Sequence, residues 1–508
     1  MAVTAGRPAA DRQPGDATGR LGADVARRLP IESRPLVDPG AVPAGIVHLG
    51  LGAFHRAHQA VYTEEAVAAG GGDWGIIGVA PRSADVVNQL RAQDNLFSVT
   101  SLAASEAATR VIGILAGVRR AADDPDAIVA LLADPAIRVV TLTVTEKAHQ
   151  LDPATGRLRP DDALVADLTT DRAPGTVPGL LVRGLIARAA TGAGPIALVS
   201  CDNLPSNGAR LRGMVTEALA YPGARVPGVA ADWVAANVSF PATMVDRIVP
   251  ASTPETLAAA QRALGAADLA AVAAEPYRQW VIEDDFPGGR PAWERAGAVL
   301  AGDVGAWERL KLRSLNGVHS ALAYLGALAG CATIAEALAL PGMRPLLARL
   351  IAEDIAPSLA APDGVSAVGY GDQVLDRFAN PAICHRTLQV AMDGSQKLPQ
   401  RVLHTIVDRR AAGATPRWAA LVVAAWMRFA RGKADDGTAL PLDDPLADEI
   451  VSALGDAPDT PAGLAEALFG LTAVVPPEVA GDEVVRDLVR GWLAELDRHG
   501  VREMVAAA

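Results

Sequence analysis

The amino-acid sequence predicts an α/β domain followed by a mainly α-helical domain. From residue 41 to 295, short apolar segments of strand length alternate with segments of helical periodicity, which is typical of a parallel sheet with helices on both faces. After about residue 300, long stretches rich in Ala and Leu keep a helical period without a clear strand. The change falls near "GGRPAWE", residues 288–294, and a length of 508 residues suits two large domains.

The expected elements follow one another in a regular order. A strand at 46–49 leads through a tight turn at 50–53 into a helix at 57–69, and the remaining strands are expected at 74–80, 96–102, the end of 125–146 (after a helix) and 194–203. The clearest helical stretches of the second domain are 310–340, 343–356 and 416–431. Residues 1–40 lack an apolar block, so we expect a flexible leader without a secretory signal.

Composition and charge exclude several classes of protein. Hydrophobic residues make up 50% of the chain and charged residues 20%, as expected for a globular enzyme rather than a disordered chain. The net charge of -12 disfavours a nucleic-acid or membrane-surface partner, because no cationic field is available. The three cysteines, Cys201, Cys331 and Cys384, are far apart and form no CxxC pair. This pattern argues against a disulfide framework, and we expect a cytoplasmic protein. No coiled-coil pattern is exposed, so we expect a monomer or weak homo-oligomer.

The turn "GLGAFH" carries two glycines of the dinucleotide-binding fingerprint. Gly50 permits the tight turn and Gly52 allows a pyrophosphate to approach the backbone at a helix N-terminus. His55, Arg56 and His58 crowd the first helical turn, where cations are unfavourable to the helix dipole, so a bound anion would explain them. An ordinary βα turn is one alternative, and a metal at His55 and His58 is another, although no acidic or thiol ligand lies nearby in the sequence.

These observations define the candidate cofactor site. We expect the turn to bind the cofactor through Gly50, Leu51, Gly52, Ala53, Phe54, His55 and Arg56. An acidic residue usually ends the second strand and binds the ribose hydroxyls, but here Arg82 and Ser83 occupy that region. We therefore expect NAD as the cofactor and leave NADP open.

The segment "LKLRSLNGVHSALAYLG", residues 310–326, places three polar residues at the start of an apolar run. On a regular helix, His319 lies about 80° and Asn316 about 140° from Lys311, so all three share one broad face. A lysine held against apolar walls loses preference for its charge and can exchange protons with an alcohol. The asparagine amide suits a developing alkoxide, and the histidine can orient a hydroxyl. The alternatives are a solvated helix end for Lys311, a local kink at Asn316 and a core position for His319. The three residues together favour a catalytic site.

Seven segments together resemble one known family. They are "GLGAFHRAHQ", "TLTVTEK", "SCDNLPSNG", "FPATMVDRIVP", "QWVIEDDFPGGRPAWE", "KLRSLNGVHSALAYLG" and "DGSQKLPQR". In this order they closely resemble the long-chain polyol dehydrogenases, or mannitol dehydrogenase family, which includes mannitol 2-dehydrogenases and fructuronate reductases (mannonate oxidoreductases). The resemblance implies a metal-free, nicotinamide-dependent enzyme, with a Rossmann-type domain at 41–295 and a helical substrate-binding domain at 296–508.

The resemblance also implies roles for individual residues. Lys311 matches the general acid/base, Asn203 and Asn316 match the amides that hold the substrate oxygen, and His319 matches a substrate-orienting residue. Glu146 in "VTEK" matches a glutamate that relays protons from the lysine to solvent, and Asp246 in "MVDR" matches a pocket-lining residue. The structural alternatives are a strand-end cap for Glu146 and an ion pair of Asp246 with Arg247.

The stretch "NPAICHRTLQVAMDGSQKLPQR" bears on the substrate. Mannitol-oxidising relatives carry an arginine aligned with Gln389, whereas His385 and Arg386 resemble fructuronate reductases, and Lys397 is kept by both groups. We expect Arg386, with His385 and Lys397 nearby, to bind a substrate carboxylate, unless Arg386 pairs with Asp376 or Asp393. The resemblance thus favours interconversion of D-fructuronate and D-mannonate. A neutral polyol such as mannitol or arabinitol and a catalytically silent sugar-acid-binding protein are alternatives, and the cysteine count disfavours a zinc enzyme.

Overall fold

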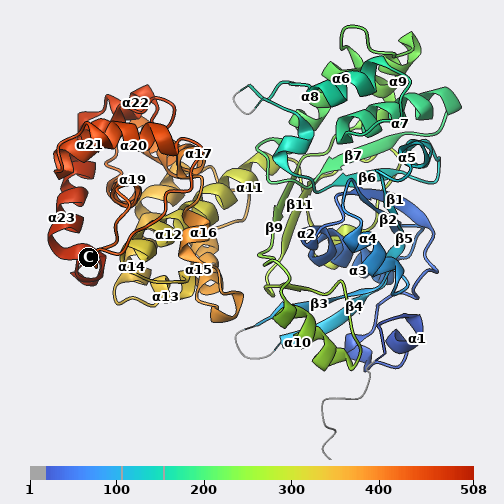
Figure 1. Ribbon diagram of the computed structural model, residues 1–508, viewed down its shortest axis with the longest axis horizontal. Helices are drawn as coiled ribbons and strands as arrows, with labels where there is room; N and C mark the ends of the chain where they lie inside the picture. The colour runs from blue at the N-terminus through green and yellow to red at the C-terminus, as the bar shows by residue number, and fades with distance from the viewer. Residues whose placement is uncertain (1–18, 104–106, 153–154, 508) are drawn as a thin grey trace, which may run out of the picture.

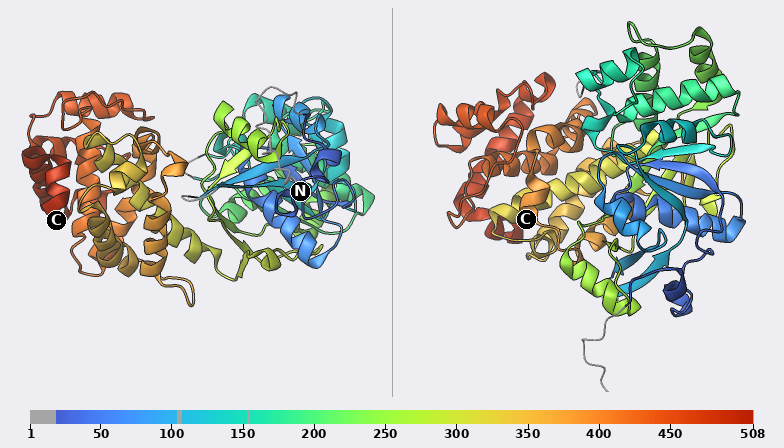
Figure 2. Two further views of the ribbon diagram at one scale, coloured as in Figure 1. Left: turned by 90° about the horizontal axis from the view of Figure 1, so that it is seen from below. Right: turned by 45° about the vertical axis from the view of Figure 1, so that its right-hand side comes forward.

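The computed structural model describes residues 19–103, 107–152 and 155–507 and confirms the predicted fold class. A parallel-sheet domain comes first and a helix-rich domain second, and helix α11 (Val304–Lys311) runs from one to the other (Figure 1). Figure 2 shows the two domains as separate masses from below, with the helices of the second domain packed around one another.

The N-terminal domain is built on a six-stranded sheet in which every neighbouring pair is parallel. In spatial order its strands are β5 (Leu115–Arg120), β2 (Gly75–Ala80), β1 (Ala44–Leu49), β6 (Val139–Leu142), β7 (Ile196–Ser200) and β8 (Val238–Ser239). Successive residues alternate between two buried layers, as Val139 and Val140 do. The chain turns from one half of the sheet to the other between β1 and β6, so the ligand crevice is expected at the carboxyl ends of these strands.

Helices cover both faces of this sheet (Figure 1). One face packs against α2 (Ala53–Ala57), α3 (Gln59–Gly70) and α4 (Asp85–Arg91), and the other against α5 (Pro125–Leu132), α6 (Asp162–Thr169), α7 (Val177–Thr191), α8 (Asn207–Leu219) and α9 (Gly228–Asn237). Side chains of Asp124, Asp161 and Thr176 accept backbone N–H groups and so fix the starts of α5, α6 and α7.

Two small sheets extend the first domain, and one of them corrects a prediction. Residues 96–102 were expected in the parallel sheet, but β3 (Phe97–Leu102) pairs antiparallel with β4 (Ala107–Ile112) and parallel with β10 (Val272–Ala274). The apolar pattern of a strand does not encode which strand it will pair with. The second small sheet comprises β9 (Thr243–Asp246), β11 (Gln279–Glu283) and β12 (Val299–Ala301), and helix α10 (Pro254–Leu264) lies between β9 and β10 in the chain.

The expected flexible leader also needs correction. Residues 19–40 contain α1 (Ala23–Ala26) and a short 3-10 helix at Ile31–Ser33, whereas residues 1–18 lie outside the described part of the chain. Leu21 and Leu29 are buried against Leu96, Val111 and Leu264. Two isolated leucines in a polar segment form no apolar block in the sequence. Their burial was not predictable, because the residues that cover them come from distant parts of the chain.

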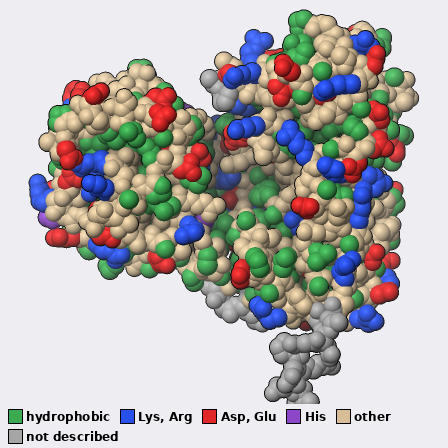
Figure 3. Space-filling model, viewed as in Figure 1, with side chains coloured by type: hydrophobic (Ala, Val, Ile, Leu, Met, Phe, Trp, Pro, Cys, Tyr) green, Lys and Arg blue, Asp and Glu red, His purple; other side chains and the backbone are tan. Residues whose placement is uncertain are grey.

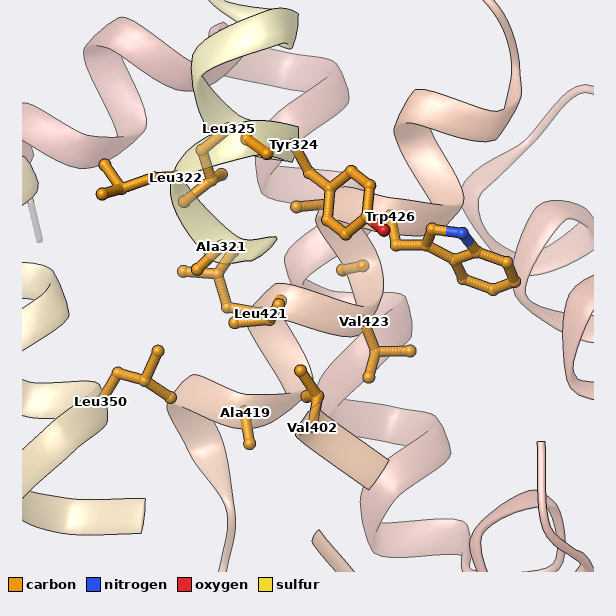
Figure 4. Packing of buried hydrophobic residues seen from close by; sticks show 14 of the residues in the cluster. Ala321, Leu322, Tyr324, Leu325, Leu350, Val402, Ala419, Leu421, Val423 and Trp426 are labelled. Atoms are coloured by element: carbon orange, nitrogen blue, oxygen red, sulfur yellow. The ribbon is translucent and has the colours of Figure 1, made fainter. Parts of the chain in front are cut away.

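The C-terminal domain is organised around α12 (Val318–Leu328) and α19 (Arg417–Ala430), which pack against each other. Every residue of α12 is buried, and Figure 4 shows Tyr324 of this helix beside Trp426 of α19. Around this pair lie α13 (Ile334–Leu338), α14 (Met343–Arg349), α15 (Ala367–Phe378), α16 (Thr387–Ala391), α17 (Gly394–Leu398), α18 (His404–Ala411), α20 (Ala447–Gly455), α21 (Pro461–Phe469), α22 (Pro477–Ala480) and α23 (Glu483–Ala507). None of the described helices combines the length and apolar character needed to cross a bilayer.

Three π-helical segments interrupt the helices of this domain. They are Leu312–Gly317, Leu350–Ile355 and Pro399–Leu403, and the first packs against the other two. Gly317 allows the close approach, since a Cβ there would lie 2.8 Å from the carbonyl oxygen of Arg401. The first segment directly follows Lys311, so the stretch 310–326 is not one regular helix as expected. Such π-turns are frequent at functional sites.

Candidate active site

The turn between β1 and α2 has the backbone form of a dinucleotide-binding turn. Gly50 has a φ of 107°, and a Cβ at this position would lie 1.9 Å from the carbonyl oxygen of Thr143, so only glycine fits. At Gly52 the nearest atom to an added Cβ is 3.8 Å away, which leaves open space at the start of α2. Strand, turn and helix meet at the switch point of the sheet, so the turn fits the phosphates of a dinucleotide.

The side chains of His55 and Arg56 do not have the role expected from charge. His55 is fully buried and stacks on His48 with 3.4 Å between ring centroids, and burial holds its pKa well below the usual value. The Arg56 guanidinium donates to the carbonyls of Gly52 and Ala270. The backbone N–H of His55 can meet a phosphate, whereas that of Arg56 donates to the Gly52 carbonyl, and both side chains belong to the protein interior.

The other members of the turn are likewise partly structural. Leu51 is buried against Gly78, where a Cβ would lie 2.6 Å from its side chain, and Phe54 stacks on His58. His58 Nε2 bonds to the carbonyl of Gln279 at 2.9 Å. In the described part of the chain, no three His, Cys, Asp or Glu side chains converge as ligands of a metal would.

Lys311 reaches from the end of α11 to the carboxyl ends of two strands. Its Nζ donates to Oδ1 of Asn203, 3.0 Å away in the loop after β7, and to the carbonyl oxygen of Val245 in β9, 2.8 Å away. Burial lowers the pKa of the amine from its usual value. The charges of Arg377 and Arg401 lower this pKa further, whereas the carboxylates of Asp246 and Glu308 oppose the shift.

Asn316 and His319 offer groups that the protein itself does not use. Both are buried, and the Asn316 amide has no hydrogen bond to another described residue. His319 stacks on Phe378 with centroids 4.6 Å apart, and its buried Nε2 lacks a partner. Burial holds the pKa of His319 well below its usual value, so the ring is uncharged. Figure 3 shows the surface hollowed between the two domains, between which α11 passes in Figure 1.

Comparison with known proteins decides the family. Residues 44–295 match the description "Mannitol dehydrogenase Rossmann domain", and residues 303–470 match "Mannitol dehydrogenase C-terminal domain". The chain belongs to the mannitol dehydrogenase family. The resemblance seen in the sequence motifs is thereby confirmed.

Members of this family that are similar over nearly the whole chain differ in substrate. D-mannonate oxidoreductase of Escherichia coli (strain K12) is 39% identical over 488 residues, covering 95% of this chain and 99% of the relative. Mannitol 2-dehydrogenase of Cereibacter sphaeroides is 38% identical, with coverages of 85% and 90%. The Pseudomonas fluorescens mannitol 2-dehydrogenase, solved as a ternary complex with NAD and D-mannitol, is 33% identical with a TM-score of 0.82, covering 96% of this chain and 99% of that one. This family member is thus an NAD-dependent oxidoreductase that acts on a secondary alcohol of a polyol or sugar acid.

In this mannitol dehydrogenase family chain, the Asp246 carboxylate is bound by an arginine that no sequence motif indicated. Arg377 of α15 donates to both Asp246 oxygens, at 2.7 and 3.0 Å, and to both oxygens of Glu275, at 3.0 and 2.7 Å. The expected alternative, an ion pair with Arg247, is not formed; Arg247 donates to backbone carbonyls instead. All three charged groups are buried, and they join the helical domain to the sheet domain beside Lys311.

The three residues expected to bind a carboxylate lie on the helical domain in different environments. His385 packs edge-on against His319 at 4.7 Å, and its buried Nδ1 has no partner. Lys397 donates to the carbonyl of Met392 at 2.6 Å and lies 3.5 Å from Asp393; burial lowers its pKa. Arg386 is exposed at the start of α16. Neither alternative ion pair of Arg386 forms, since Asp376 pairs with Arg344 and Asp393 with Lys397.

The expected proton relay at Glu146 lies on the surface, at the start of a short 3-10 helix. Glu308, which no sequence motif singled out, is a second carboxylate of this region, and its charge acts on Lys311. Its carboxylate accepts the backbone N–H of Ser206 at 3.1 Å, interacts electrostatically with Lys311 and has a pKa raised by burial. The spacing of three residues before Lys311 on one helix was the available signal.

A buried pair holds the loop that carries Asn203. Asp202 accepts from His149 Nε2 at 2.7 Å and from the backbone N–H of Val144 at 2.7 Å, and Ser200 donates to the same carboxylate at 3.1 Å. The loop after β6 is thereby tied to the loop after β7. Asp202 thus acts as a positioning residue for its neighbour Asn203.

We expect Asp202→Asn to lower kcat for the sugar substrate by about 10- to 100-fold, because the N–H groups of Val144 and His149 approach different carboxylate oxygens and an amide presents an NH2 group to one of them. Steady-state kinetics would measure kcat and the KM for NAD, and thermal unfolding would report on the fold. Asp123→Asn, on the surface beside Arg120, is the matched control. An unchanged kcat in Asp202→Asn would remove the positioning role.

Proposed function

We propose that this enzyme interconverts D-mannonate and D-fructuronate, oxidising a secondary alcohol to a ketone and reducing it in reverse. The nearly full-length similarity to D-mannonate oxidoreductase supports this choice. The observation that carries it is a set of basic side chains on the helical domain: His385, Arg386 and Lys397. Among the described residues, Asp393 is the only carboxylate in an ion pair with any of the three. A carboxylate distinguishes the sugar acid from a neutral sugar, and basic side chains recognise it.

The environment of Lys311 suits an acid/base that works in both directions. An ammonium group has three N–H donors, and two of them are taken by Asn203 and Val245. We propose that the third N–H of Lys311 points to the substrate oxygen. In reduction Lys311 gives a proton to the forming alkoxide, and in oxidation the neutral amine removes the alcohol proton.

The two asparagines stabilise the oxygen as its charge develops. Asn203 accepts from Lys311 through Oδ1, which leaves its NH2 group to donate to substrate. Asn316 supplies a second uncharged donor. Preorganised donors of this kind stabilise the negative charge of an alkoxide, while Lys311 remains the group that provides the proton. NAD, held at the turn 50–56, supplies the hydride acceptor or, once reduced, the donor. The proton on Lys311 can exchange with solvent by way of Glu308.

A spectrophotometric assay tests the proposal. We expect rapid oxidation of NADH with D-fructuronate, reduction of NAD with D-mannonate, and much slower reactions with fructose, mannitol and arabinitol; NADPH and NADP measured alongside would report the phosphate preference. Faster turnover of fructose than of fructuronate would contradict the acid substrate, and no turnover of any keto-sugar would indicate a binding protein. Activity should also survive treatment with a chelator.

A neutral polyol is the second candidate. The solved structure with a TM-score of 0.82 holds D-mannitol, and mannitol 2-dehydrogenases are as similar in identity as D-mannonate oxidoreductase. In that case the basic side chains of the helical domain would bind hydroxyl groups.

A further inference from the structure

Arg401 is a partly buried cation that forms no ion pair with a described carboxylate. It lies in the π-helical segment Pro399–Leu403, and its Nη1 donates to Oγ of Ser320 at 3.2 Å. Across residues 19–103, 107–152 and 155–507, no carboxylate lies within ion-pair distance of its guanidinium. Burial lowers the pKa of this group, and the more distant charges of Tyr324 and Asp393 oppose the shift only in part.

The fully buried arginines nearest in role are satisfied by the protein. Arg377 binds two carboxylates, Arg188 donates to four backbone carbonyls, and Arg313 binds Asp408 and Ser358. The partly buried guanidinium of Arg401 has only the Ser320 hydroxyl as a side-chain partner among the described residues, so it is less well compensated than these arginines. An anion brought by a ligand would supply the partner that the fold omits.

The position of Arg401 connects it to the reacting centre. Ser320, its hydrogen-bond partner, is adjacent to His319, and the Arg401 carbonyl contacts Gly317, next to Asn316. Lys397 lies one helical turn earlier. The charge of Arg401 lowers the pKa of Lys311, His319 and Lys397, so its guanidinium is within electrostatic range of all three groups.

Two further groups near Arg401 lack partners. The Nε2 of His319 and the Nδ1 of His385 are buried and unbonded, and their rings are 4.7 Å apart. A carboxylate can accept several hydrogen bonds at once, from a guanidinium, an ammonium and imidazole N–H groups. Arg386, by contrast, is exposed at the start of α16, where solvent weakens its attraction for an anion.

We infer that Arg401 binds the carboxylate of the substrate, with Lys397 as its partner, and so selects a sugar acid over a neutral sugar. This inference rests on the proposed function, because it names the residue that recognises the acid group. In this inference Arg401, and not Arg386, makes the main contact with the carboxylate, and Arg386 lies at the rim of the site.

Paired substrates test the inference in the full-length enzyme. In Arg401→Gln we expect the KM for D-fructuronate to rise about 10- to 100-fold, which is the range for losing a hydrogen-bonded charge. The kcat/KM for fructose should change less than about threefold. Arg401→Lys should recover part of the acid preference, because it keeps the charge without the planar fork. This variant also provides the test if Arg401→Gln fails to fold.

The other outcomes separate the possible errors. Equal losses with both substrates would overturn the inference and indicate that Arg401 supports the fold or tunes Lys311. Loss of acid preference in Arg386→Ala but not in Arg401→Gln would assign the carboxylate to Arg386. If wild-type enzyme reduces fructose but not fructuronate, the proposed function fails by itself. Competitive inhibition by mannonate then tests Arg401: a weaker inhibition in Arg401→Gln supports the inference, and an unchanged one overturns it.

Discussion

Lys311→Ala should lower kcat by roughly 10²- to 10⁴-fold in both directions, the range that positioned proton transfer contributes. The amine is held by Asn203 and Val245 at the meeting point of the two domains. Alanine removes the proton donor and acceptor, and no other described side chain takes its place between these two partners. Stopped-flow or steady-state measurement of NADH oxidation with saturating fructuronate would give the change.

The fold should survive this substitution, because Asp246 keeps its ion pair with Arg377 and Glu308 keeps its hydrogen bond from the Ser206 backbone. Lys433→Ala, at an exposed position, is the control and should keep wild-type kcat. A Lys311→Ala enzyme with near-normal turnover and a normal melting temperature would remove the lysine from the mechanism.

Arg377→Met should lower the free energy of unfolding by about 3–5 kcal/mol, since breaking a buried pair strands its partners. Here two carboxylates, Asp246 and Glu275, would remain buried without their cation. Denaturant unfolding of the variant and the wild type would measure the loss. Arg344→Met removes the exposed pair with Asp376 and should lose no more than about 1 kcal/mol.

The pH dependence of this variant has a definite sign. Burial already raises the pKa of Glu275 in the wild type, and loss of Arg377 raises it further. A carboxyl group with a raised pKa in the folded state binds its proton more tightly there, so stability falls as pH rises from the unfolded pKa through the folded one. The deficit of Arg377→Met should therefore be larger at pH 8 than at pH 5. A loss equal to that of Arg344→Met at both pH values would contradict this account of the domain junction.

The sequence was most informative where local pattern and chemistry coincide. The strand, glycine turn and helix at 46–69 and the change to a helical domain were predictable, because apolar period and turn chemistry act over a few residues. The arginine bridge was not, since Arg377 lies 131 residues from Asp246. The burial of His55 and Arg56 was not predictable for the same reason, since Ala270, whose carbonyl binds Arg56, is 214 residues away in the chain. The π-helical turn after Lys311 depends on packing of Gly317 against Arg401 rather than on local propensity.

The pH dependence of kcat/KM in both directions tests the central claim most directly, because the claim concerns the protonation of one amine. The pKa of Lys311 is lowered from 10.5 by burial. Reduction needs the protonated amine, so its rate should fall as pH rises through this lowered pKa, whereas oxidation needs the neutral amine and should rise through the same value. Opposite profiles with a shared inflection below pH 10.5 are the expected result. Profiles that move in the same sense, or an inflection at or above 10.5, would contradict a desolvated lysine as the acid/base.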